Sequence, residues 1–186
     1  TSQPLAAQAG LQMLRDGGNA IDAAVATAAV LNVVEPMSTG IGGDMFALIW
    51  DKNERKVVSL NGSGRQAAAA NVADVRKAGY ESIPNNGAGS HFAVSVPGTV
   101  HGWETALNQY GRMTLKEVLQ PAIDYALNGY AVSEVIAHGW GGAETITKLN
   151  HRPSGQELLP GSSANGAPKY GEVVKLPELG RTLQMI

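Results

Sequence analysis

The amino-acid sequence predicts a mixed α/β chain, because helical and strand patterns follow one another along its 186 residues. A nearly all-apolar helical pattern runs over residues 20–34. Two short apolar stretches, residues 45–50 and 56–60, flank a polar turn and predict a β-hairpin. Helical patterns dominate the remainder. A length of 186 residues suits one domain or part of a larger one.

The helix expected over residues 20–34 has clear start and stop signals. Asn19 is a favourable N-cap, and Asp22 lies where the positive end of the helix dipole favours an acidic group. Pro36 ends the helix, because the residue before a proline avoids helical dihedral angles. Gly17 and Gly18 can end the preceding helix.

This helix has no hydrophilic face, which predicts burial on nearly all sides. It is shorter than the roughly 20 apolar residues that span a bilayer, so we expect a core helix of a soluble protein. A carboxylate introduced at Ala24 is therefore expected to destabilise the fold. The only polar side chains between residues 20 and 34 are Asp22, Thr27 and Asn32.

Local patterns predict the other elements. Ser2 can cap a first helix with Pro4 in its opening turn, and Thr114 with Glu117 forms a capping box. We expect polar or glycine-rich loops through residues 85–87 and over residues 150–172. The expected helices are residues 72–78, 99–110, 115–128 and 133–149 with a last one from Pro177, and residues 93–96 are an expected strand.

A glycine-dense loop with Gly40, Gly42 and Gly43 precedes the expected hairpin, and such residues permit positive φ and close approach of the backbone. A dinucleotide-binding fingerprint does not fit. Its third glycine would fall at Met45, and it needs the order strand, loop, helix, whereas the order here is helix, loop, strand. Tight packing at a chain reversal is the simpler interpretation.

Composition excludes several classes of function. Fourteen basic and sixteen acidic residues give a net charge of −2, which predicts no nucleic-acid partner. The chain has no cysteine, so disulfides, thiolate nucleophiles and cysteine-bound metals are excluded. We find no signal peptide and no membrane segment, but a leader could have been removed. Both a periplasmic or extracellular location and a cytoplasmic one stay open.

Five segments together resemble one known family. They are PLAAQAGLQMLRDGGNAIDAAVA from Pro4, VVEPMSTGIGGDMF from Val33, VPGTVHGW from Val96, YGRMTLKEVLQPAIDYALNGYAV from Tyr110, and LPELGRTLQMI at the end. In this order they resemble the N-terminal part of the large subunit of a gamma-glutamyltranspeptidase. The wider group also contains cephalosporin acylases.

The resemblance implies an N-terminal-nucleophile hydrolase with an αββα sandwich. Such a protein is made as one precursor that cuts itself into a large and a small subunit, and the catalytic threonine begins the small subunit. Residues 1–186 would then be the N-terminal portion of the large subunit of a single αββα domain. The implied partner is the small subunit of the same precursor, and this chain alone would hold no catalytic residue, metal or cofactor and would be inactive.

The implied reaction transfers a gamma-glutamyl group from glutathione or a related amide to an amino acid, a peptide or water. In the resembling family an arginine after the second strand holds the α-carboxylate of the substrate, and this position corresponds to Arg65. A guanidinium is a planar two-pronged donor that matches a carboxylate. The chain departs from the family at NGSGRQAAAA, where Gln66 and residues 67–70 replace an acidic residue and a proline.

Two alternatives stay open, and the departure after Arg65 bears on the first. The chain could belong to a cephalosporin-acylase-like amidase that accepts glutaryl groups, or be a non-catalytic fragment that acts only as a structural or binding partner. A surface ion pair is the alternative role for Arg65.

The sequence assigns no catalytic, metal-binding or substrate-binding role to several other conspicuous residues. Thr1 precedes the large-subunit pattern, so we do not regard it as a nucleophile although N-terminal threonines can act as one. Ser90 and His91 are adjacent in sequence only. Trp103 and Trp140 are expected in a core or an interface. The four histidines, His91, His101, His138 and His151, lack the spacing of metal ligands.

Overall fold

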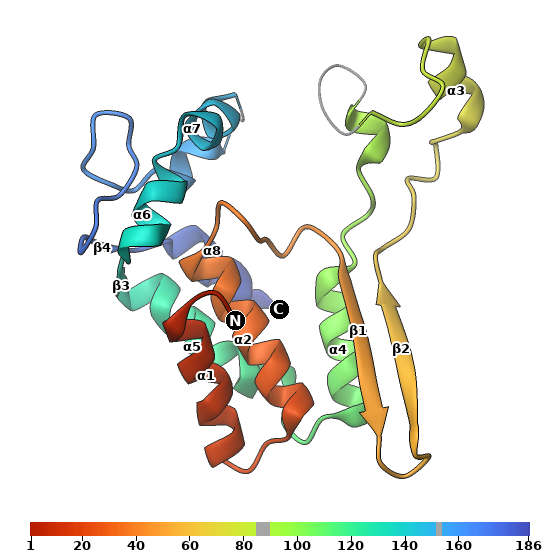
Figure 1. Cartoon of the computed structure of the whole chain (residues 1–186), viewed down its shortest axis with the longest axis vertical. Coiled ribbons are helices and arrows are strands. Elements are labelled where there is room, and N and C mark those ends of the chain that lie inside the picture. Colours follow the sequence, from red (N-terminus) through yellow and green to blue (C-terminus); the bar gives the residue numbers. More distant parts are fainter. Residues whose placement is uncertain (85–89, 152–153) are drawn as a thin grey trace. The chain divides into compact units, whose positions relative to one another are not determined.

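The computed structural model describes residues 1–84, 90–151 and 154–186, which contain both helices and strands (Figure 1). The chain divides into two units. The first contains Thr1–Gly40 and Ala106–Ile186, and the second contains Ile41–Thr105. In the part of the chain that is described, no helix has the length and the apolar content that a membrane crossing requires.

Helix α1 (Pro4–Arg15) begins the first unit. Its N-cap is Gln3, whose side chain accepts from the backbone N–H groups of Leu5 and Ala6, so the expected cap at Ser2 is wrong. The reason is the register: Pro4 is the first helical residue, which places the cap one position after Ser2. The Ser2 hydroxyl instead donates to Glu35 at 2.6 Å.

The turn between α1 and α2 (Ala20–Val34) confirms the role of the two glycines. Gly17 has a φ of +95°, and the N–H of Gly18 donates to the carbonyl of Met13 at 2.9 Å. The Asn19 side chain accepts from the N–H groups of Ile21 at 2.8 Å and Asp22 at 3.4 Å, and the Asp22 carboxylate accepts from the N–H of Asn19 at 2.6 Å. Both halves of the capping box are thus formed. The helix ends before Pro36, as predicted.

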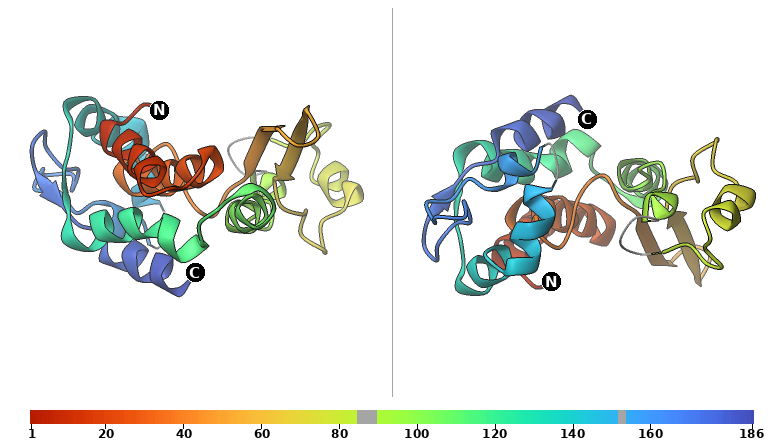
Figure 2. Two further views of the ribbon diagram at one scale, coloured as in Figure 1. Left: turned by 90° about the horizontal axis from the view of Figure 1, so that it is seen from below. Right: turned by 90° about the horizontal axis from the view of Figure 1, so that it is seen from above.

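Helix α2 packs against α1 and against α5 (Leu115–Asn128), while α5 also packs against α8 (Pro177–Met185) (Figure 2). Burial on nearly all sides is a wrong prediction at Ala24, which is exposed. Because α1 and α5 cover only part of the surface of α2, one side of this helix stays exposed. Its buried apolar residues are Val25, Ala26, Ala29, Val30, Val33 and Val34.

The helix α5 begins with the predicted capping box. Thr114 Oγ1 accepts from the N–H of Glu117 at 3.3 Å, and the Glu117 carboxylate accepts from the N–H of Thr114 at 2.7 Å. This backbone hydrogen bond, with a second one from the Thr114 hydroxyl, holds the pKa of Glu117 below its usual value of 4.5. The helix ends at Gly129, whose φ is +97°.

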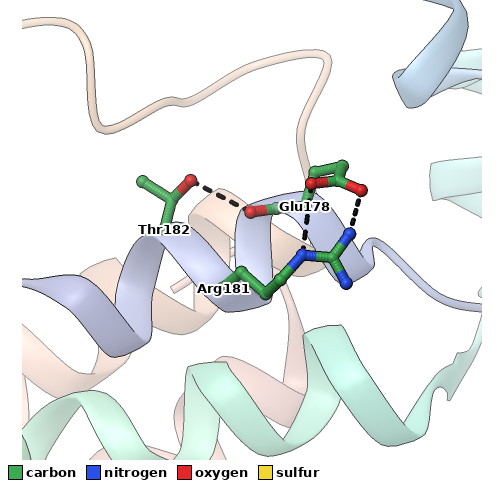
Figure 3. A network of polar contacts seen from close by, with 3 residues as sticks. All are labelled: Glu178, Arg181 and Thr182. Carbon is green, nitrogen blue, oxygen red and sulfur yellow. Dashed lines mark hydrogen bonds and ion pairs between the residues drawn. The ribbon is translucent and has the colours of Figure 1, made fainter.

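Polar contacts within α8 fix its first turns (Figure 3). The guanidinium of Arg181 pairs with the Glu178 carboxylate one turn earlier, and the Thr182 hydroxyl donates to the Glu178 carbonyl at 3.0 Å. Both members of the ion pair are more than half exposed, so the pair adds little to stability.

The helix expected over residues 133–149 is split into α6 (Glu134–Trp140) and α7 (Ala143–Asn150), and Gly141 and Gly142 separate them. A short 3-10 helix, η2 (Gly155–Leu158), interrupts the expected long loop. An unpredicted small sheet pairs β3 (Tyr130–Ala131) with β4 (Val173–Val174). The Tyr130 hydroxyl donates to the Val33 carbonyl at 2.9 Å, and burial raises the pKa of this phenol.

In the second unit, β1 (Met45–Asp51) and β2 (Lys56–Gly62) form the predicted antiparallel hairpin. The unit also holds α3 (Val72–Lys77), η1 (Ser90–Ala93) and the first residues of α4 (Thr99–Tyr110). The strand expected over residues 93–96 is wrong. Ala93 ends η1, and only Ser95 forms an isolated bridge, with Gln66. The loop expected through residues 85–87 lies outside the described residues.

The hairpin has one covered and one open face. Ile49 is buried, and a Cβ on Gly102 of α4 would lie 2.6 Å from Met45 Cγ, so this face packs closely. Phe46, Leu48 and Trp50 alternate along β1 with the residues of this covered face. Their side chains are 67%, 80% and 62% exposed. The second face is thus apolar and uncovered in this chain.

Candidate functional site

Arg65 follows β2 at a place where the backbone is tightly constrained. Gly64, just before it, has a φ of +78°, and a Cβ there would lie 1.8 Å from the Val96 carbonyl oxygen. The Arg65 carbonyl accepts from the N–H of Val96 at 2.8 Å. Glycine is therefore required at position 64, and the backbone of Arg65 has a fixed position against residues 95–96.

A third segment completes this arrangement. The N–H groups of Gly98 and Thr99 both donate to the Gly43 carbonyl, at 3.0 and 3.1 Å. A Cβ on Gly98 would lie 2.3 Å from the Gly62 carbonyl oxygen, so this glycine too is sterically required. Residues 43–45, 62–66 and 95–99 meet here, and we call this the three-segment junction.

The Arg65 side chain projects from the junction without an ionic partner. It is exposed. Within residues 1–84, 90–151 and 154–186, ion pairs join Glu54 to Lys56, Glu144 to Lys148 and Glu178 to Arg181, and none involves Arg65. The surface ion pair considered as its alternative role is therefore not formed in the described structure, and its guanidinium donors remain available to a ligand.

Two further polar residues of the junction escape prediction from sequence. The Ser95 hydroxyl donates to Asp44 Oδ1 at 3.0 Å, and Ser95 also bridges to Gln66, the residue after Arg65. Asp44 lies in the conspicuous GIGGDM motif, which could have drawn attention to it. Ser95 is 51 residues away from Asp44, and no local signal marks the contact.

The glycine loop before β1 differs from its prediction. Neither Gly40 nor Gly42 has a positive φ, and a Cβ on either would meet open space. Only Gly43 makes a close contact, through its carbonyl. In this chain, steric crowding therefore does not explain the first two glycines.

Other candidates from the sequence do not form sites in the described residues. Trp103 and Trp140 are buried, as expected, and the Trp140 indole donates to the Leu158 carbonyl at 2.8 Å. The ring of His91 contacts that of Phe92, with centroids 4.1 Å apart. Thr1 is exposed ahead of α1. In the part of the chain described, no three acidic or histidine side chains are grouped to hold a metal ion.

A hollow of about 770 Å³ lies between α1 and α5, away from Arg65 in sequence and in lining. Its walls include Asp16, Glu117 and Asp124, but Glu117 is engaged in the capping box, and Gln12 and Gln120 donate to the other two. These carboxylates accept hydrogen bonds from residues three or four positions away in their own helices or caps, so we favour the junction as the candidate site.

Comparison with known proteins identifies the family of this chain. Residues 6–186 match the family described as Gamma-glutamyltranspeptidase. The chain therefore belongs to the gamma-glutamyltranspeptidase family.

Three relatives illustrate its range. The chain is 50% identical over 130 residues to the glutathione hydrolase-like YwrD proenzyme of Bacillus subtilis, covering 69% of this chain and 24% of that protein. The structure of Helicobacter pylori gamma-glutamyltranspeptidase matches with a TM-score of 0.86 and 33% identity, covering 100% of this chain and 52% of that one. Cephalosporin acylase from Bacillus halodurans matches with a TM-score of 0.83 and 42% identity, covering 100% and 34%.

The chain spans only 24% of the YwrD proenzyme and 31% of the glutathione hydrolase proenzyme of the same organism. Most of the length of these relatives thus has no counterpart in this chain.

Proposed function

We propose that this chain is the N-terminal portion of the large subunit of a gamma-glutamyl transferase or hydrolase. Membership of the family supports the reaction class, and the word proenzyme in the relative's name supports a precursor that is cut. The proposed nucleophile is the threonine that begins the small subunit in the resembling family, and no segment of residues 1–186 resembles the start of that subunit. The isolated chain is accordingly expected to have no amidase activity.

The proposed chemistry is acyl transfer through a covalent intermediate. The threonine hydroxyl attacks the amide carbonyl of the donor while its own amine takes the proton. Hydrogen-bond donors stabilise the negative oxygen of the tetrahedral intermediate, and the amine product leaves. An amino acid, a peptide or water then attacks the acyl–threonine ester and releases the threonine.

In this proposal, Arg65 holds the α-carboxylate of the acyl donor. The supporting observation is its exposed guanidinium without an ionic partner in the described structure, on a backbone that Gly64 and Val96 fix in place. A fixed backbone and free donors suit a binding residue, because only the side chain has to be ordered when the ligand binds.

The hairpin in this proposal is part of an αββα sandwich. The rest of the precursor supplies the strands that cover the face of Phe46, Leu48 and Trp50, since a lone two-stranded hairpin is marginally stable in water. Three large apolar side chains on one uncovered face support this assignment.

The test of the function uses the complete processed enzyme. Arg65→Ala should lower kcat/KM for a gamma-glutamyl anilide by roughly 30-fold to 1000-fold. This corresponds to about 2 to 4 kcal/mol for a donor carboxylate that is left without its partner in the binding site. Arg65→Lys should recover part of the loss, since lysine offers a point charge in place of a fork. A donor without the α-carboxylate is the control and should lose far less. Equal losses for both donors would give Arg65 a structural role.

A second candidate function is that of a cephalosporin-acylase-like amidase acting on glutaryl groups. The 42% identity to the Bacillus halodurans acylase favours it, as does the departure from transpeptidases after Arg65. Residues 67–70 there form a turn, with the Ala70 N–H donating to the Ala67 carbonyl at 2.9 Å. Rates of release from a gamma-glutamyl anilide and a glutaryl anilide by the wild-type enzyme separate the two functions.

A further inference from the structure

The groove between α1 and α5 lies entirely in the first unit and shares no residue with the three-segment junction. Both helices pack against α2, and a space of about 770 Å³ stays open between them. The Met113 sulfur lies against Gly18, where a Cβ would come within 2.9 Å of it, and the Tyr125 ring packs edge to face on Tyr130. Contacts within the unit thus hold the apolar wall of the groove in place. This wall consists of Met13, Met113, Pro121 and Tyr125.

Three exposed carboxylates line the same groove, and each uses only one of its oxygens in the fold. Gln12 donates to Oδ1 of Asp16 at 2.8 Å, and Gln120 donates to Oδ1 of Asp124 at 2.8 Å. Glu117 accepts with Oε2 in its capping box. Within residues 1–84, 90–151 and 154–186, the other oxygen of each carboxylate has no hydrogen bond, and none of the three forms an ion pair. These oxygens can accept from a ligand.

The groove is more acidic than the chain as a whole. In the described structure its charged lining groups are the three carboxylates and the ammonium of Lys116, whereas the whole chain has sixteen acidic and fourteen basic residues. No three acidic or histidine side chains of the described residues are grouped to hold a metal ion. A single cation therefore does not match the groove, and a ligand that spreads several positive charges along it does.

The helical walls restrict the backbone of such a ligand. The backbone groups of α1 and α5 are paired within each helix, so a polypeptide in the groove has to pair its own backbone groups, as a helix does. Methionine side chains adjust to the shape of apolar partners, and free carboxylate oxygens accept from lysine or arginine. The groove thus matches a helix with apolar residues on one face and basic residues on both flanks.

We propose that the groove between α1 and α5 binds a basic amphipathic helix of a partner protein. The apolar face of that helix contacts Met113 and Tyr125. Its basic flanks reach Asp16 on the α1 side and Asp124 on the α5 side. Arg65 takes no part in this interaction, so the inference is independent of the proposed reaction.

The probe is a synthetic, fluorescein-labelled peptide of about 14 residues, with leucines at positions i, i+3, i+4 and i+7 of a helix and lysines on both flanks. Fluorescence anisotropy measures its Kd for the complete processed enzyme. A second peptide has glutamate in place of each lysine, and a third has the composition of the first without helical spacing. The lysine peptide should bind at least about 10-fold more tightly than either of the others, and its Kd should rise with salt because the charged contacts are exposed.

Variants of the enzyme locate the binding site. Asp16→Asn combined with Asp124→Asn removes two charges and keeps the size of both side chains. It should raise the Kd of the lysine peptide by about 2-fold to 30-fold, the range expected for the loss of two exposed ion pairs. Met113→Gln should also weaken binding, because it makes the apolar wall polar. Glu134→Gln with Glu157→Gln is the matched control, since it removes two exposed carboxylates of the first unit that do not line the groove, and it should leave the Kd unchanged.

Several results would overturn the inference. Failure of the lysine peptide to bind, or equal affinity for the glutamate peptide, would show that charge complementarity does not select the ligand. Equal affinity for the peptide without helical spacing, or an equal effect of the control pair, would mean that net charge alone attracts the peptide. If the changes at Asp16 and Asp124 instead alter the free energy of unfolding or the oligomeric state of the enzyme, the rest of the enzyme or a second copy covers the groove, and the proposal is wrong.

Discussion

Asp22 in the first unit and Arg65 in the second are both charged, yet they differ in burial and in their bonding partners. Asp22 is completely buried, and backbone N–H groups from α2's own N-terminus and from the α4–α5 turn donate to it. Arg65 is exposed and, within the described residues, forms no ion pair. A buried charge must be satisfied by its own fold, whereas an exposed one on a rigid backbone is available to a ligand.

Apolar side chains show the same difference between the units. In the first unit, Val30 and Val33 of α2 are fully buried among helices of the same unit. In the second, the side chains of Phe46, Leu48 and Trp50 on one face of the hairpin are mostly exposed. The first unit thus buries apolar side chains among its own helices, while the hairpin leaves one apolar face uncovered. Two predictions test this difference, and a third concerns a charged helix cap of the first unit.

The largest effect is expected in the core of α2. Ala26→Asp would place a carboxylate at a position with no exposed surface and no donor provided for it, so we expect a loss of about 3 to 5 kcal/mol in the free energy of unfolding. Ala24→Asp, two residues earlier on the exposed side, is the matched control and should stay within about 0.5 kcal/mol of wild type. Urea unfolding of both variants measures this, and similar losses would show that the side of Ala24 is covered in the folded protein.

An intermediate effect is expected on the hairpin. Leu48→Ser should change the stability of this chain by less than about 0.5 kcal/mol, because Leu48 is already 80% exposed. In the complete precursor, where we propose that a second sheet covers this face, the same change should cost about 1 to 3 kcal/mol. Leu48→Met keeps the apolar volume and should be nearly neutral in both. A neutral Leu48→Ser in the precursor would leave the face uncovered and argue against the sandwich.

The elements predicted correctly are those with local signals. Asn19 and Thr114 begin helices through side chains that bond to backbone groups two or three residues away. Glycines at positions 17 and 129 end helices with a positive φ. Such contacts are visible in a window of a few residues, so sequence alone identifies them.

The wrong or missing predictions depend on contacts between distant segments. The pairing of Tyr130 with Val174 and the bridge of Gln66 with Ser95 join residues that no local pattern connects. The exposure of Ala24 depends on which helices cover α2, which periodicity does not reveal. At the candidate site, the family resemblance and a neighbouring glycine led to Arg65, whereas Ser95 became visible only through the fold.

The smallest effect is expected from pH at the N-terminus of α5. Hydrogen bonds from Thr114 hold the folded-state pKa of Glu117 below its usual 4.5, so ionised Glu117 stabilises the fold above that pH, and this contribution is lost as the pH falls through the lowered pKa. Glu117→Gln keeps the shape of the capping box but not its charge. Wild type should therefore be more stable than Glu117→Gln near neutral pH, and the difference should shrink in acid, at about pH 3. In a Thr114→Ala background, which lacks the hydroxyl donor, the difference and its dependence on pH should both be reduced. Urea unfolding of the four proteins at the two pH values measures this, and a difference that is the same at both would mean that the charge of Glu117 does not stabilise the helix.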